Sequence, residues 1–252
     1  MHSKLVNELA VCGLNAVLAA AQYHPQNINR LFLREERLPL FKDLCRQLAE
    51  RKRPYKICDD EELLKICKDQ HHQGVVAMIG DNIVEPLTRD DLDFWIDGAK
   101  TGIVLHSVGN ELNLGSIVRA AAFFGVHFVI ISELEEDARR LSTAAFRAAE
   151  GGMEHIVIRS VKKTEAFLRD ASKKLVTIGT DTRARLRIGD LPAIVNEKPS
   201  GIALVLGNEE TGLPPEVKQH CRYLMRIPGT GNMESLNVSQ AAALFLHAIY
   251  GL

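Results

Sequence analysis

Apolar residues recur with two rhythms along the chain, and an acidic stretch divides it into two segments. In the first segment, a period of about 3.6 residues predicts helices, and short apolar runs predict strands. The predicted helices cover 13–23, 39–52 and 59–67, and the predicted strands cover 30–33, 54–58 and 74–79. Because these elements alternate within 1–80, we expect a small α/β sandwich there.

The second segment repeats the alternation on a larger scale. Its apolar runs, rich in Val and Ile, predict strands over 101–108, 127–132, 155–159, 174–180, 201–207 and 223–228. Helices are predicted over 114–124, 138–149, 162–172, 214–220 and 236–250. Such continuous apolar strands between helices are typical of a parallel sheet covered on both faces. Ligands of these sheets bind beyond the carboxyl ends of the strands, so the loops at those ends are candidate sites.

Residues 81–100 separate the two segments and hold two basic against six acidic residues. Thr88 is placed to cap one short helix in this stretch. Trp95, the only tryptophan, is expected to anchor that helix to one of the domains. The pattern thus predicts a first domain over 1–80, an acidic linker over 81–100 and a second domain over 101–252.

Composition narrows the class of protein. The chain has 252 residues, 46% of them hydrophobic, which is enough for one large or two ordinary globular domains. No apolar run approaches the roughly 18 residues of a membrane span, and the N-terminus does not resemble a signal peptide. Five cysteines without a CxxC pair argue against a zinc site or a disulfide framework. We therefore expect a cytoplasmic protein without a metal or a membrane contact.

The first candidate loop follows the strand that ends near residue 108. Asn113 is placed to cap the next helix, and Arg119 lies about a turn and a half further on. An always-charged guanidinium there could clamp a phosphate or stabilise an anionic oxygen. The alternative is an ordinary cap followed by a surface arginine.

The second loop, 207–215, follows the predicted strand 201–207. Gly207 and Gly212 let its backbone approach a ligand closely, and Pro214 and Pro215 open a helix. The loop lacks the Lys-Ser/Thr pair of a P-loop, and the chain has no GxGxxG after its first strand. The alternative is a plain strand-to-helix turn with two solvated carboxylates.

The third loop, 228–239, precedes an alanine-rich helix. Ser235, Asn237 and Ser239 stand at the entrance of that helix, where one capping residue would suffice. The excess of hydrogen-bonding groups indicates contact with a ligand.

The order of the three loops carries a resemblance. NLGSIVRAA, then LGNEETGL, then IPGTGNMESLNVSQAAAL resembles the SpoU/TrmH family of SPOUT methyltransferases, which methylate the 2′-hydroxyl of RNA ribose. The likeness covers 101–252, and AAEGGMEHIVI also resembles the family's S-x-G-A-x-E-H stretch. Residues 5–80 resemble the substrate-binding domain of the ribosomal protein L30e type. The resemblance implies an α/β fold whose second domain contains a deep trefoil knot.

The resemblance also implies roles for individual residues. S-adenosylmethionine is expected as the cofactor, held in a bent shape by Thr180, Gly207, Asn208, Ile227 and Leu236. The residues expected to orient and activate the ribose are Arg119, Asn113, Glu209, Ser235 and Asn237. Because the pKa of arginine exceeds about 12, Arg119 fits an electrostatic stabiliser or phosphate clamp better than a base. The chain departs from the family pattern at Asn110-Glu111, where Asp-Pro is usual, which puts the geometry of that loop in doubt.

We therefore expect an S-adenosylmethionine-dependent RNA 2′-O-methyltransferase that acts as a homodimer, on ribosomal RNA in preference to transfer RNA. The alternatives are a tRNA 2′-O-methyltransferase, or a catalytically silent RNA-binding or ribosome-assembly factor of the same fold. Taken as an average over the whole chain, the net charge of −1 argues against an RNA partner. However, the excess of acidic residues lies in 81–100, whereas 1–80 hold 12 basic against 10 acidic residues. Local arginine clusters, such as Arg183, Arg185 and Arg187, are thus expected to contact phosphates.

Overall fold

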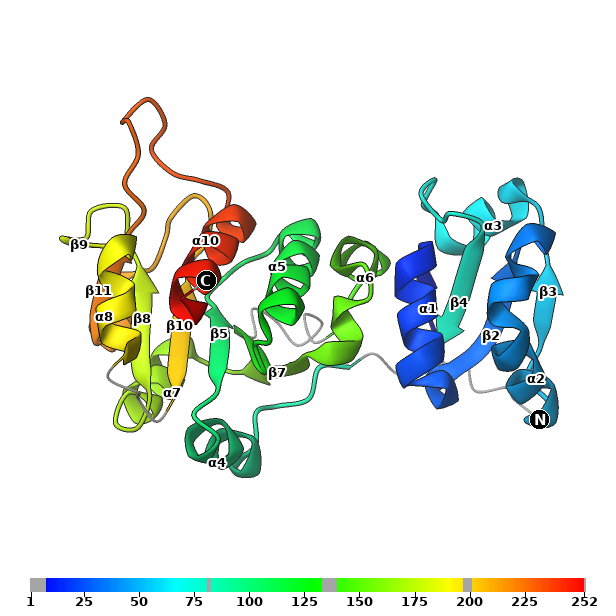
Figure 1. The fold of residues 1–252 in the computed structure, drawn as a ribbon, viewed down its shortest axis with the longest axis horizontal. Helices are drawn as coiled ribbons and strands as arrows, with labels where there is room; N and C mark the ends of the chain where they lie inside the picture. Colours follow the sequence, from blue (N-terminus) through cyan, green and yellow to red (C-terminus); the bar gives the residue numbers. More distant parts are fainter. Residues whose placement is uncertain (1–7, 81–82, 133–139, 197–200, 252) are drawn as a thin grey trace.

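The computed structural model describes residues 8–80, 83–132, 140–196 and 201–251, and it shows two α/β units side by side (Figure 1). The smaller unit contains a four-stranded mixed sheet in the order β1 (Leu9–Cys12), β4 (Val75–Ile79), β2 (Ile28–Leu33) and β3 (Tyr55–Ile57). Its helices are α1 (Leu14–Tyr23), α2 (Lys42–Glu50) and α3 (Asp60–Cys67), with 3-10 turns at Pro25–Asn27 and Glu35–Phe41.

The two faces of this small sheet are covered by different helices. Leu31 and Leu33 belong to the apolar core that includes residues of α1 and α2, whereas Cys12 and Val76 pack with residues of α3. The expected α/β sandwich is therefore present. The sequence does not predict strand β1, because its four residues continue into α1 without a polar residue between them. Gly13, at φ 95°, makes the break between the strand and the helix.

The larger unit contains a seven-stranded parallel sheet, which confirms the predicted sheet type. Its order is β7 (Val157–Val161), β6 (Phe128–Ser132), β5 (Thr101–Leu105), β10 (Ile202–Leu206), β8 (Val176–Thr180), β11 (Tyr223–Arg226) and β9 (Leu186–Arg187). All five residues of the central strand β10 are buried, as expected of a strand covered on both faces. The two-residue edge strand β9 is not among the predicted strands.

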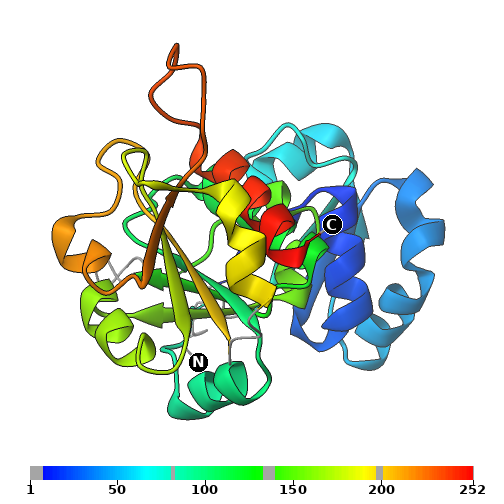
Figure 2. The ribbon, with the colours of Figure 1, turned by 60° about the vertical axis from the view of Figure 1, so that its left-hand side comes forward.

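Helices cover both faces of this sheet (Figures 1 and 2). The core on one face includes residues of α5 (Glu111–Phe124), α6 (Thr143–Ala149), α8 (Leu191–Asn196) and α10 (Val238–Tyr250). The core on the other face includes residues of α4 (Arg89–Asp97), α7 (Thr164–Ala171) and α9 (Pro215–Lys218). Helix α8 is absent from the predicted set, and positions 138 and 139 of the predicted helix 138–149 lie outside the described residues. Further 3-10 turns cover Gly152–His155 and Ile188–Asp190.

The short acidic helix α4 packs on the large sheet. Thr88 caps it, accepting from the Asp91 backbone N–H while the Asp91 side chain accepts from the Thr88 backbone. Trp95 is fully buried, and its Nε1 donates to the carbonyl oxygens of Lys100 (3.1 Å) and Ile202 (3.2 Å). The expected capping by Thr88 and anchoring by Trp95 are both confirmed.

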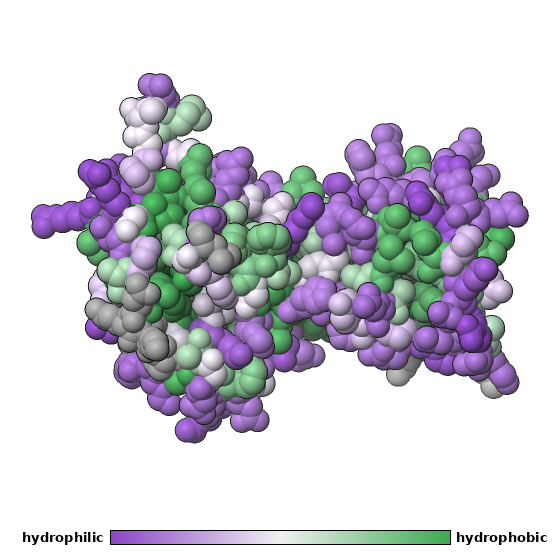
Figure 3. All heavy atoms as spheres, viewed as in Figure 1, coloured by the Kyte–Doolittle hydropathy of each residue, from purple (hydrophilic) through white to green (hydrophobic). Residues whose placement is uncertain are grey.

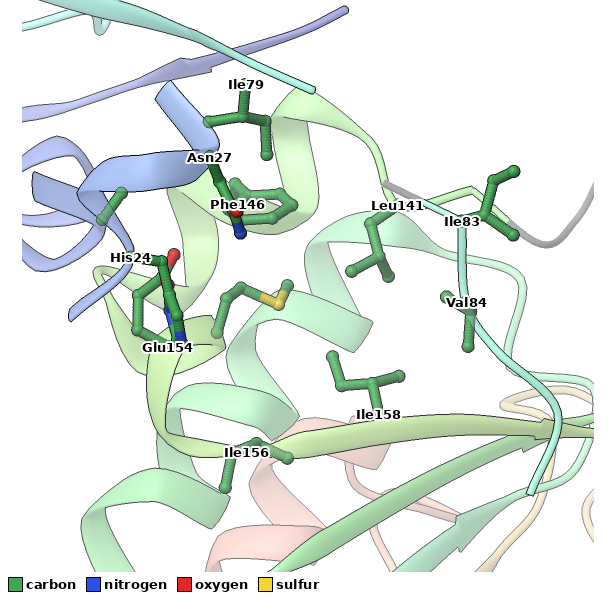
Figure 4. A pocket seen from close by; sticks show the side chains of 12 residues that line it. His24, Asn27, Ile79, Ile83, Val84, Leu141, Phe146, Glu154, Ile156 and Ile158 are labelled. Atoms are coloured by element: carbon green, nitrogen blue, oxygen red, sulfur yellow. The ribbon is translucent and has the colours of Figure 1, made fainter. Parts of the chain in front are cut away.

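The segment formed by α6 and the turn Gly152–His155 lies between the two units (Figure 1). Arg147 forms a 2.7 Å ion pair with Asp69 of the small unit, and Thr143 Oγ1 donates to the carbonyl oxygen of Ala10 (2.7 Å). A cavity of about 220 Å³ opens beside this segment, and His24 and Glu154 contact one another at its rim (Figure 4). Polar contacts thus join the small unit directly to the layer that supports α5.

No helix in the described ranges is long and apolar enough to cross a membrane.

Candidate active site

Three of the residues expected to hold the cofactor lie at one edge of the large sheet. Thr180 ends β8, Gly207 directly follows β10, and Ile227 directly follows β11. These strands are parallel and adjacent, so their carboxyl ends meet at the same edge. Thr180 Oγ1 donates to the Val205 carbonyl oxygen (3.4 Å), which ties the ends of β8 and β10 together. Leu236, the fourth such residue, lies on the exposed loop that leads from β11 to α10.

A chain of side-chain hydrogen bonds connects the three loops at this edge. Asn113 Nδ2 donates to Glu209 Oε1 (2.5 Å), and Asn237 Nδ2 donates to Asn113 Oδ1 (3.0 Å). Asn113 is buried, and 96 and 124 residues of sequence separate it from its two partners. The structure therefore brings together three of the five residues expected to orient and activate the ribose.

Arg119 and Ser235 are not part of this network. Arg119 is exposed on α5, about 9 Å further along the helix axis than Asn113 and roughly 120° around it. Ser235 lies in the segment 228–237, where every residue is exposed. Figure 2 shows this loop standing away from the body of the protein. Within the described part of the chain, neither side chain has a recorded hydrogen bond.

The start of α5 differs from the expectation. Asn110, not Asn113, caps the helix, and its Oδ1 accepts from the N–H groups of Leu112 (2.9 Å) and Asn113 (3.3 Å). Asn113 lies in the first turn, which leaves its amide free to bridge Glu209 and Asn237. Glu111 accepts a 2.8 Å hydrogen bond from Ser142, the cap of α6. Both residues that depart from the family pattern are thus engaged in holding this loop.

The turn that follows β10 is tightly closed. A Cβ on Gly207 would lie 2.4 Å from the carbonyl carbon of Gly212, so only glycine fits there. Asn208 Oδ1 accepts from the N–H groups of Glu210 (2.9 Å) and Thr211 (3.2 Å), and its Nδ2 donates to the Ser107 carbonyl oxygen (2.9 Å). Both ends of the Asn208 amide are therefore occupied within the protein.

Sequence reasoning missed several residues at this edge. Ser107 adopts φ 55° although it is not glycine, and its N–H donates to Ser132 Oγ (3.1 Å). His106 contacts Thr164 Oγ1 through Nδ1 (3.1 Å). Burial lowers the pKa of His106, although Glu165 and Glu216 act in the opposite direction, so its imidazole is neutral at pH 7. No sequence motif marks these positions, because a left-handed serine and a half-buried histidine have no distinctive spacing.

The groups at the carboxyl edge of the large sheet are chemically suited to bind an adenosyl group. Thr180 contributes a hydroxyl, and the backbone beyond β10 approaches closely because Gly207 lacks a side chain. Ile227 is half-buried, while Leu236 and Met233 on the neighbouring loop are exposed apolar side chains. Apolar surface beside convergent polar groups is typical of a small-molecule site. In the described residues, no three His, Cys, Asp or Glu side chains gather where they could hold a metal ion.

Comparison with known families decides the class. Residues 100–247 match the SpoU rRNA Methylase family, and residues 10–82 match the domain described as RNA 2′-O ribose methyltransferase substrate binding. The chain belongs to the SpoU rRNA methylase family. The expected family and the expectation of an RNA methyltransferase are thereby confirmed.

Two relatives illustrate the range of this SpoU family. The chain is 31% identical over 250 residues to the uncharacterized tRNA/rRNA methyltransferase YfiF of Escherichia coli O157:H7, covering 98% of this chain and 69% of YfiF. It is 29% identical over 242 residues to the 23S rRNA (guanosine-2′-O-)-methyltransferase RlmB of Bordetella pertussis, covering 94% of each chain.

Solved structures share the fold of this SpoU-family chain. An rRNA methyltransferase from Sinorhizobium meliloti superposes with a TM-score of 0.77 at 24% identity, covering 97% of this chain and 87% of that one. AviRb from Streptomyces viridochromogenes, in complex with the cofactor AdoMet, superposes with a TM-score of 0.71 at 22% identity, covering 97% and 89%. The predicted fold class is therefore confirmed, whereas the knot and the dimer stay predictions.

Proposed function

We propose that this protein transfers a methyl group from S-adenosylmethionine to a ribose 2′-hydroxyl of ribosomal RNA. The hydrogen-bonded chain Glu209–Asn113–Asn237 carries the proposal, because it joins the three family motifs at the carboxyl edge of the sheet. The SpoU family, the substrate-binding domain and the RlmB relative support RNA ribose as the methyl acceptor. A structure of this fold that contains AdoMet supports the cofactor.

The residues assigned to the site divide into two groups. Thr180, Gly207, Ile227 and Leu236 hold the cofactor, while Asn113, Glu209, Asn237 and Ser235 orient the ribose. When bound, S-adenosylmethionine supplies a methyl group attached to a positively charged sulfur. The neutral thioether that remains after the transfer is a good leaving group. The protein must mainly align the ribose oxygen with that methyl carbon, and alignment can contribute about 7–11 kcal/mol to lowering the barrier.

Arg119 stabilises the negative charge that develops on the ribose oxygen as the hydroxyl proton passes to water. A guanidinium placed near that oxygen lowers the pKa of the hydroxyl without itself losing a proton. Arg119 is exposed and has no recorded partner in the described chain, so its charge is available to a substrate.

A second copy of the chain completes the site in this proposal. Within one protomer, Arg119 and Ser235 have no hydrogen bond to the Glu209–Asn113–Asn237 chain, and the exposed loop 228–236 leads away from it. Phe123 on α5 is 81% exposed, and Leu244 on α10 is exposed as well. Figure 3 shows hydrophobic residues gathered on the face that carries α8 and α10. If two copies pair through the surface formed by α5 and α10, the exposed apolar side chains are covered and the partner's Arg119 comes toward the site.

Residues 1–80 act as the RNA-binding domain, 81–100 as a connecting segment and 101–252 as the catalytic domain. In the first domain, Arg34 pairs with Glu36 and Asp60, and Arg51 donates to the Pro25 carbonyl oxygen. The exposed side chains of Lys52 and Arg53 are therefore better placed to meet phosphates. In the second domain, Arg183, Arg185 and Arg187 are all exposed. All five cysteines are free, which agrees with a cytoplasmic location.

The test is incubation of the purified protein with radiolabelled S-adenosylmethionine and total RNA, followed by digestion and mapping of the labelled nucleotide. Label on a ribose of ribosomal RNA is the expected result. Label confined to tRNA would support the tRNA alternative. RNA binding without any transfer of label would identify the protein as a catalytically silent factor.

A further inference from the structure

The turn between β5 and α5 contains a strained residue. Ser107 adopts φ 55°, which lies in the left-handed region that residues other than glycine, asparagine and aspartate rarely occupy. Such conformations persist only where the surrounding structure holds them, and they cluster at functional sites. The turn leads directly to Asn110, which caps α5, and to Asn113.

Two neighbouring strands hold this turn from opposite sides. Ser132, the last residue of β6, accepts a hydrogen bond from the Ser107 N–H (3.1 Å). Asn208, just beyond β10, donates from Nδ2 to the Ser107 carbonyl oxygen (2.9 Å). Because β6 and β10 flank β5 in the sheet, the backbone polar groups of Ser107 are fixed by both neighbours of its own strand.

The orientation of the Asn208 amide is determined by its surroundings. Its Oδ1 accepts from two backbone N–H groups, those of Glu210 (2.9 Å) and Thr211 (3.2 Å), so the oxygen must face the turn. The amide nitrogen then faces Ser107. Its backbone carbonyl accepts from the Gly212 N–H (2.9 Å), which closes the same turn. The Asn208 side chain thus connects the second loop to the first through hydrogen bonds at both ends of its amide; we call this connection the Asn208 clip.

The clip lies beside the network that joins the loops. Glu209, the next residue, accepts from Asn113, which lies six residues after Ser107. We infer that Asn208 is a positioning residue, which holds the Ser107 turn so that Asn113 meets Glu209, and that it does not recognise the cofactor through its side chain. This inference rests on the proposed function.

Asn208→Asp tests the inference most sharply. The substitution keeps an oxygen toward the Glu210 and Thr211 N–H groups but turns a second oxygen toward the Ser107 carbonyl, which replaces attraction by repulsion. We expect kcat to fall about 10- to 100-fold, as small displacements of catalytic groups do, while the Kd for S-adenosylmethionine measured by calorimetry changes less than about twofold. A Kd raised about tenfold or more, or an unchanged kcat, would overturn the inference.

Ser107→Gly in the Asn208→Asp background supplies a rescue test. Glycine adopts positive φ without strain, so the turn needs the clip less, and we expect kcat to recover several-fold. A merely structural role of Asn208 elsewhere in its own turn would show no such rescue, and that result would contradict the inference. Gln219→Glu is the matched control, since it makes the same amide-to-carboxylate change at an exposed position away from the loops.

Hydrogen exchange separates this inference from the proposed function. In Asn208→Asp the backbone amides of residues 107–113 should exchange faster than in the wild type, whether or not any RNA is methylated. Ser132→Ala removes the hydrogen bond between Ser132 and the Ser107 N–H, and it should accelerate exchange in the same segment. Unchanged exchange in both variants would overturn the inference, whereas a wild-type protein without transferase activity would overturn only the proposed function.

Discussion

Asn237 Nδ2 donates a 3.0 Å hydrogen bond to Asn113 Oδ1, so the cap of the last helix is tied to the first turn of α5. Asn113 passes the connection on, because its Nδ2 donates to Glu209. One buried amide therefore needs both a donor and an acceptor end. Aspartate at this position would have the same shape but only acceptors.

Asn113→Asp should lower kcat by about 100-fold, because its carboxylate would repel Glu209 and disorganise the site. Burying this charge should also lower the free energy of unfolding by about 1–3 kcal/mol, measurable by urea titration. Both deficits should shrink in mildly acidic buffer, where a protonated aspartic acid can donate to Glu209. If neither deficit depends on pH, the hydrogen bond that Asn113 donates to Glu209 is not the cause of the loss.

Arg119→Ala should abolish methyl transfer yet leave the free energy of unfolding within about 0.5 kcal/mol of the wild type, because the side chain is exposed and unpaired in the described chain. Binding of S-adenosylmethionine, followed by calorimetry, should persist. Transfer at the wild-type rate would refute the role assigned to Arg119.

Mixing variants tests whether Arg119 serves the partner's site. Arg119→Ala and Glu209→Gln should each be inactive alone, but a re-annealed mixture should regain about one quarter of wild-type activity, since each mixed dimer has one intact site. No recovery after mixing, despite dimers detected by light scattering, would place Arg119 in the site of its own protomer.

The sequence predicts the parallel sheet because its strands are continuous apolar runs. Strand β10, for example, is buried along its whole length. It does not predict β1 or β9, since four and two residues are too short to show a period. At the site, the motifs identify Asn113, Glu209 and Asn237. They do not reveal that Asn110 takes the cap, because Asn110 and Asn113 are both residues that favour that position and the choice between them is made by local hydrogen bonds. Nor do they reveal that Ser107 is left-handed, because that conformation is held by Ser132 and Asn208, which only the folded sheet brings beside it.

Gly102→Ala should destabilise the larger unit. A Cβ there would lie 2.2 Å from the Trp95 ring, and the buried indole has little room to move. The expected loss is about 1–3 kcal/mol, as for other overpacked cores. Fluorescence of Trp95, the only tryptophan, reports the unfolding directly. Gly109→Ala is the control, because nothing lies within 4 Å of its Cβ position; equal losses in both variants would exclude the steric explanation.

Acid should weaken the contact between the two units. Burial by itself would raise the pKa of Asp69, but hydrogen bonds from the His71 N–H and the attraction of Arg147 outweigh it and lower the pKa. A lowered pKa stabilises the folded state above the ordinary aspartate value of 3.8, and this contribution is lost as the pH falls through the folded value. Urea midpoints measured from pH 7 to pH 3 should therefore fall less steeply in Asp69→Asn than in the wild type. Parallel curves for the two proteins would show that Asp69 does not contribute.

Gly151 determines how closely the small unit approaches α6. Its φ is 93°, and a Cβ would lie 2.8 Å from Ala19 Cβ and 3.1 Å from the Asn15 carbonyl oxygen, both on α1. Gly125 has a similar φ of 74° but nothing within 4 Å, so Gly125→Ala reports the backbone strain alone, about 1 kcal/mol. Gly151→Ala should cost more than this control and should also raise the radius of gyration measured by small-angle X-ray scattering, because α1 must move away. If Gly151→Ala matches Gly125→Ala in both measurements, the close packing of α1 on this turn does not hold the two units together.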